Sequence, residues 1–162
     1  MSFRGLSLWS FRLSLVCFAL AWLLPVFPGE LGYLFPGAWA FLASPFVAFG
    51  CWATFLLGGF EPRMLLWAVL LTVVTAMNGV FVLAPFLREA FAERPLLVSL
   101  SAGISAVSAA ILCHFPPGAD ALLPVWSAVE LAWISSFVLM SFSGAAGCLA
   151  EAPSSPSTQS VP

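Results

Sequence analysis

Residues 64–87, MLLWAVLLTVVTAMNGVFVLAPFL, run for 24 positions without one charged side chain. An α-helix rises about 1.5 Å per residue, and the hydrocarbon core of a bilayer is about 30 Å thick. About 20 apolar residues therefore cross a membrane once as a helix. This stretch is long enough for one crossing and too short for two, so it predicts a single transmembrane helix.

Four further stretches have the same character and lie at 13–29, 31–60, 95–119 and 121–150, the last interrupted only by Glu130. The chain as a whole is 62% hydrophobic and 7% charged, with a mean hydropathy of +1.07. A soluble domain is about one quarter charged, and a disordered chain is poor in aromatic residues. Both classes are excluded. Five arginines against seven acidic residues also give no patch that would bind nucleic acid. The expected fold is an all-α, polytopic integral membrane protein with five, possibly four, transmembrane helices packed as a bundle.

Proline and glycine mark the expected ends of these helices. Pro-Gly pairs at 28–29 and 36–37 favour type II turns, and 58–63 and 115–120 have loop composition. The expected helices run at about 9–27, 38–59, 64–87, 95–114 and 122–146, forming one transmembrane domain over 1–150. The Ser/Pro-rich tail 151–162 is expected to be disordered. Cleavage of a signal peptide after Ala21 is disfavoured, because the apolar run continues past it.

The arginine distribution bears on sidedness. With a cytoplasmic N-terminus and five crossings, Arg4, Arg12 and Arg63 fall inside and Arg88 and Arg94 outside. This small excess favours a cytoplasmic N-terminus and an external C-terminus. The chain contains arginine but no lysine, which suggests a GC-rich genome, and the sequence resembles small polytopic proteins of bacterial inner membranes in general character.

No enzyme chemistry is evident. Cys17, Cys51, Cys113 and Cys148 include no Cys-x-x-Cys pair, and His114 is the single histidine. No metal site and no cofactor are therefore expected. Nucleotide-binding loops and catalytic triads are also missing from the sequence, so the protein is predicted not to be an enzyme.

Glu130 and Asn78 are the candidate intramembrane polar residues. With a helix starting near residue 121, Glu130 would lie about 13 Å below the surface, where it would form a proton or cation site or a lock between helices. If the helix enters the core only after Trp126, Glu130 lies near the interface and needs no partner. Asn78 follows Thr72 and Thr75 at helical spacing, and such a polar face usually joins a membrane helix to a neighbour.

Small residues at every fourth position mark expected helix-packing faces. They are Gly50, Thr54 and Gly58 in the second helix, Ala102, Ala106 and Ala110 in the fourth, and Gly144 in the fifth. These faces predict a structural or accessory subunit that works through helix–helix association, with the lipid bilayer and other membrane subunits or itself as partners. The alternative is a small oligomeric transporter or channel that uses Glu130. A membrane enzyme with Glu130 or His114 as its base has the least support.

Overall fold

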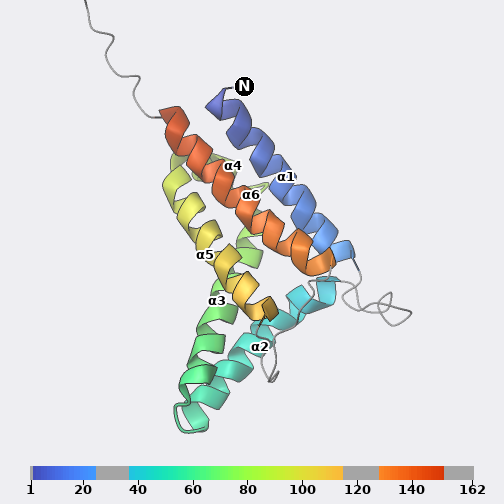
Figure 1. Cartoon of the computed structure of the whole chain (residues 1–162), viewed down its shortest axis with the longest axis vertical. Coiled ribbons are helices and arrows are strands. Elements are labelled where there is room, and N and C mark those ends of the chain that lie inside the picture. The colour runs from blue at the N-terminus through green and yellow to red at the C-terminus, as the bar shows by residue number, and fades with distance from the viewer. Residues whose placement is uncertain (1, 25–36, 115–127, 152–162) are drawn as a thin grey trace, which may run out of the picture.

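The computed structural model describes residues 2–24, 37–114 and 128–151, and within these ranges the regular secondary structure is helical throughout. The helices, shown in Figure 1, are α1 (Phe3–Leu23), α2 (Gly37–Leu57), α3 (Pro62–Leu83), α4 (Arg88–Glu93), α5 (Pro95–His114) and α6 (Ala128–Glu151). Four of them, α1, α3, α5 and α6, are long and apolar enough to cross a membrane. They pack together, which confirms the prediction of an all-α, multi-pass membrane protein.

The first expected helix begins earlier than the charge pattern suggested. α1 starts at Phe3 rather than near residue 9, because the Ser2 side chain caps it by accepting a 3.2 Å hydrogen bond from the backbone N–H of Gly5. Arg4 thus lies within the helix together with Arg12, which the expected helix already included, and both are exposed. The turns expected at 28–29 and at residue 36, and the loop at 115–120, lie outside the described residues.

The third expected helix ends earlier than residue 87. α3 has Pro62 at its first turn and ends at Leu83, two residues before Pro85, which lacks the N–H that would continue the helix. The charged cluster that follows forms the short helix α4 instead of a loop. α5 has the predicted bounds. α6 is described from Ala128 and extends to Glu151, past the expected end at 146, whereas residues 122–127 and the rest of the tail lie outside the described residues.

The helices α1, α6 and α5 form one layer, with α6 between the other two (Figure 1). α3 packs against α5, and α2 packs along α3. The α2–α3 hairpin turns at Gly58–Phe60, where Gly59 and Phe60 both have positive φ angles of 95° and 63°. A hydrogen bond of 3.0 Å from the Trp52 indole to Thr72 Oγ1 joins the two helices of this hairpin.

The course of α2 differs from the expected topology of five spans. α2 starts near the end of α1 and runs on toward the α2–α3 turn, rather than returning alongside α1 (Figure 1). α1 and α2 therefore run in roughly the same direction, and α3 is the first helix to run back (Figure 1). The start of α1 lies beside the C-terminal end of α6. Ser7 and Ser143 are in direct contact there. The start of α1 and the end of α6 therefore lie at the same end of the described structure, and the side of the membrane on which the N-terminus lies stays a prediction.

Candidate functional site

Asn78 is the most deeply buried of the predicted polar site residues. Only 6% of its surface is exposed, and its Oδ1 accepts a 3.0 Å hydrogen bond from the indole N–H of Trp133. Asn78 belongs to α3 and Trp133 to α6, so this bond joins two helices that are far apart in the sequence. A polar side chain in this position has the interhelical role that the spacing of α3 suggested.

Aromatic side chains surround this hydrogen bond and form the aromatic cluster (Phe18, Trp22, Phe41, Phe81, Trp133 and Phe137). The rings of Phe18 and Phe81 stack with centroids 4.6 Å apart, and those of Trp22 and Phe41 stack at 5.4 Å. Trp133 meets Phe41 edge-on at 5.5 Å. The cluster brings α1, α2, α3 and α6 together at one place, so it is the structural centre of the bundle.

The hydrogen bonds of this centre are incomplete. Within the described residues, Asn78 Nδ2, Thr75 Oγ1 and Trp22 Nε1 are buried without a hydrogen-bond partner. Thr72 differs, because its hydroxyl donates to Ala68 O at 2.7 Å and accepts from Trp52. The predicted polar face of α3 is thus divided between two neighbours: Thr72 faces α2, whereas Asn78 faces α6. The amide, hydroxyl and indole groups of this centre do not ionise at neutral pH. They can form hydrogen bonds, but they cannot serve as the acid or base of a proton transfer.

Glu130 lies at the beginning of α6 and not in its middle. It is the third residue of the helix and is half-buried. It interacts with the Cys113 thiol on α5 electrostatically and through a side-chain hydrogen bond. A carboxylate in the first turn is stabilised by the positive end of the helix dipole. The structure does not bring Glu130 to Asn78, whose oxygen is bonded to Trp133.

The small residues of α5 and α6 pack inside the protein. Ala102 and Ala106 are buried, and Ala110 is half-buried against the core. A Cβ atom added to Gly144 would lie 2.5 Å from the Pro95 carbonyl oxygen and 2.6 Å from the Ser99 nitrogen. Glycine therefore permits the close approach of α6 to the start of α5.

The small residues of α2 have the opposite placement, since Gly50, Thr54 and Gly58 are all exposed. A Cβ atom on Gly50 would meet nothing within 4 Å. Gly58 also ends the helix, with its N–H bonded to Thr54 O at 2.7 Å. Phe46 and Leu57 lie on the same side of the helix by their spacing and are 78% and 88% exposed. We call these five residues the α2 face.

The sequence analysis missed the polar contacts that hold α6 to its neighbours. Ser7 Oγ donates to Ser143 O at 2.9 Å, and Ser143 Oγ donates to Ser7 O at 2.8 Å. Ser141 Oγ donates to Ser99 O at 2.8 Å. The signal was the spacing of Ser7, Ser10 and Ser14 along one side of α1, which is the pattern that was recognised in α3.

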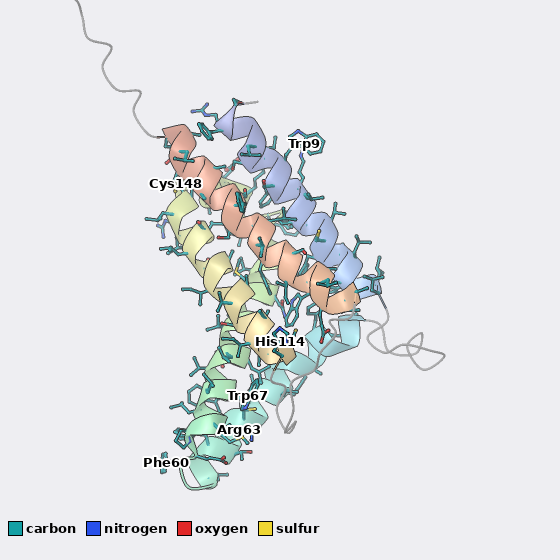
Figure 2. The ribbon with its side chains drawn as sticks, in the orientation of Figure 1. Trp9, Phe60, Arg63, Trp67, His114 and Cys148 are labelled. Carbon is teal, nitrogen blue, oxygen red and sulfur yellow. The ribbon has the colours of Figure 1, made fainter. Side chains whose placement is uncertain are left out.

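The cysteines and the histidine are the other reactive groups of the described residues. All four cysteines are free thiols, and Cys51 and Cys113 are buried. Among the residues that the structure describes, no group of three or more His, Cys, Asp or Glu side chains is placed to hold a metal ion. Figure 2 shows His114 at the lower end of α5, with Trp67 and Arg63 further toward the α2–α3 turn and Cys148 at the opposite end of the molecule.

Comparison with protein-family models, with curated proteins and with solved structures gives no match for this chain. The class of the protein follows from its own fold, since four long apolar helices packed together define a multi-pass helical membrane protein.

Proposed function

We propose that this is a small multi-pass protein of a bacterial inner membrane that serves as a structural or accessory subunit and associates with a second copy of itself through the α2 face. The observation that carries the proposal is the contrast between the two sets of small residues. Those of α5 and α6 are already used inside the protein, whereas Gly50, Thr54 and Gly58 are exposed.

The chemistry of the α2 face supports self-association. Glycine and threonine at every fourth position allow two helix backbones to approach closely in lipid, where van der Waals packing replaces the hydrophobic effect as the driving force. Phe46 and Leu57 are large, exposed side chains on the same face as the small residues. A second α2 related by a two-fold axis would place its own Phe46 and Leu57 against the small residues of the first, as an isologous interface requires.

Sidedness is the second part of the proposal. Arg4 and Arg88 line one cavity, and Arg94 lines another beside the same Glu151, so these three arginines lie at one end of the bundle. Arg63 lies at the other end (Figure 2). By the positive-inside rule, this distribution favours a cytoplasmic location for the end of the bundle that carries the start of α1 and the end of α6.

Association can be tested with cysteine crosslinking in native membranes. A Thr54→Cys variant is expected to form a disulfide-linked dimer under mild oxidation, above the background of the parent chain with its four native cysteines. Gly50→Ile in the same background is expected to abolish the crosslink by filling the space between the two helices. The matched control is Gly79→Ile on α3, because a Cβ there also meets nothing within 4 Å. A monomer by native mass spectrometry, with no crosslink, would contradict the proposal, and a crosslink to a protein of another mass would replace self-association with a different partner.

The alternative function, an oligomeric transporter with Glu130 as its coupling site, gains no support from the position of that residue. Glu130 lies in the first turn of α6 and interacts with a thiol. These features are typical of a residue that stabilises a helix end. Proton flux that is equal in the parent chain and in Glu130→Gln would separate the proposed function from a transporter.

A further inference from the structure

A cavity of about 450 Å³ opens at the end of the molecule where α1 begins and α6 ends. Residues of α1, α4, α5 and α6 all contribute to its walls. Three charged side chains line it, namely Arg4, Arg88 and Glu151. Most of the remaining lining is apolar or small, with Phe11 and Phe91 in edge-to-face contact at 6.4 Å and Val98 buried beside them.

The charges of this cavity favour a phosphate group. Two guanidinium groups and one carboxylate give the lining a formal charge of +1 (2 − 1). Arg4 comes from α1 and Arg88 from α4, so one anion between them would be held from two directions. The planar guanidinium matches the geometry of phosphate oxygens and can bind them through two parallel hydrogen bonds.

The apolar lining requires the ligand to have a second, hydrophobic part. Inorganic phosphate would leave Phe11, Phe91 and Val98 exposed to water within the cavity. A phospholipid would cover these side chains with the first methylene groups of its acyl chains. Phosphate and hydrocarbon adjacent to each other are the defining chemistry of a membrane phospholipid.

The cavity also lies at the right depth. α1 has 21 residues and α6 has 24, so they are about 31 and 36 Å long at 1.5 Å per residue. Both slightly exceed a hydrocarbon core of about 30 Å. Arg4 near the start of α1 and Glu151 at the end of α6 therefore reach the headgroup region. Basic pockets between transmembrane helices at this level bind acidic lipid headgroups.

We infer that this cavity is a binding site for an anionic phospholipid, with its phosphate held between Arg4 and Arg88. An apolar groove of about 630 Å³ between α3 and α5 adjoins the cavity, because Phe91 and Val98 line both. Met77 and Ile104 line this groove further along the two helices. It offers a surface for one acyl chain, and Ala90, Phe91 and Glu93 of α4 line part of it.

The experiment measures lipid retention by native mass spectrometry of the full chain in detergent, with phosphatidylglycerol, phosphatidylethanolamine and inorganic phosphate as separate probes. Phosphatidylglycerol is expected to bind in preference to phosphatidylethanolamine. Arg4→Gln and Arg88→Gln are each expected to weaken this binding about fivefold, which corresponds to about 1 kcal/mol per arginine near a membrane surface. The matched control is Arg12→Gln, which removes an exposed arginine of α1 that does not line the cavity.

Glu151→Gln separates the two lipid classes. Removing this carboxylate is expected to strengthen phosphatidylglycerol binding, whereas a site built for an ethanolamine headgroup would lose its ammonium partner and bind phosphatidylethanolamine more weakly. Unchanged melting of the lipid-free variants, followed by tryptophan fluorescence, establishes that they fold. The inference is overturned if Arg4→Gln and Arg88→Gln bind like Arg12→Gln, if phosphatidylethanolamine is preferred, or if inorganic phosphate displaces the lipid.

Discussion

The indole N–H of Trp133 donates a 3.0 Å hydrogen bond to Oδ1 of Asn78, and this bond links α6 to α3 at the centre of the aromatic cluster. The amide nitrogen of the same asparagine is buried without a partner among the described residues. One side chain therefore both connects two helices and leaves a donor unsatisfied. In a low-dielectric interior the hydrogen bond is strengthened, and the unpaired donor costs free energy.

A double-mutant cycle measures how much the hydrogen bond between Asn78 and Trp133 contributes to the free energy of unfolding. Asn78→Leu, Trp133→Phe and the double variant are expected to give a coupling free energy of about 0.6 kcal/mol, and not above about 1.7 kcal/mol, because interhelical hydrogen bonds in membranes fall in this range. Thermal unfolding in detergent provides the free energies. Strictly additive single effects would show that the bond contributes nothing.

Gly144→Ala is expected to destabilise the protein by about 1–3 kcal/mol, as overpacking of a close contact does. The added Cβ would lie within 2.6 Å of backbone atoms of Pro95 and Ser99, which cannot rotate away. Gly79→Ala is the matched control, since its Cβ meets no atom within 4 Å and alanine has the higher helix propensity. Equal melting temperatures for the two variants would contradict the packing of α6 on α5.

Glu130→Gln is expected to lower the free energy of unfolding by about 0.3–1 kcal/mol, the range for a charge at a helix N-terminus. Glu130→Asp keeps the charge and is expected to lose less. Proton flux into vesicles reconstituted with either variant is expected to equal that of the parent chain. If the parent chain conducts protons and Glu130→Gln abolishes the flux, the transporter function replaces the one proposed here.

Gly59→Ala is expected to destabilise the α2–α3 turn by about 1–2 kcal/mol, because an L-residue with a side chain is strained at positive φ. Gly59 has a φ of 95° and no neighbouring atom within 4 Å of an added Cβ, so backbone strain is the single cause there. Thermal unfolding compared with Gly79→Ala isolates this effect. A stabilised Gly59→Ala variant would show that the turn adopts another conformation.

Reporter fusions test the sidedness. Alkaline phosphatase or a fluorescent protein fused before Ser2 or after Pro162 is expected to report the cytoplasm in both cases, since the start of α1 and the end of α6 share one end of the bundle. A reporter inserted at Phe60 is expected to lie on the other side. Opposite results for the two terminal fusions would restore an odd number of crossings.

The sequence predicted the helices well where proline or charge limited them from both sides. α5 has the expected bounds, Pro95 and His114, and its start is explained by the proline, which fits the first turn of a helix. The early start of α1 was not predicted, because hydropathy does not detect a side-chain cap. The Ser2 cap starts α1 at Phe3, so the helix includes Arg4 ahead of the expected start near residue 9.

The candidate site was only partly predictable. Asn78 was identifiable from its spacing on α3, but its partner Trp133 is an indole that hydropathy counts as apolar. The depth of Glu130 was left open by the sequence, because it depends on where α6 begins, and the structure places this residue in the first turn of α6. The exposed α2 face and the buried face of α5 have the same small-residue pattern, and only the packing of the folded chain distinguishes them.

The reciprocal hydrogen bonds between Ser7 and Ser143 join α1 to α6 across a separation of 136 residues in the chain. α1 has its most extensive contacts with α6, so its main packing partner becomes available only after α6 has been synthesised. A chain that stops before α6 would leave Ser7, Ser10 and Ser14 of α1 without the helix that packs against them. Membrane chaperones or proteases that recognise unassembled helices would then have access to these polar groups. Correct assembly of the bundle thus depends on the 24 residues of α6, although the other described helices are made before them.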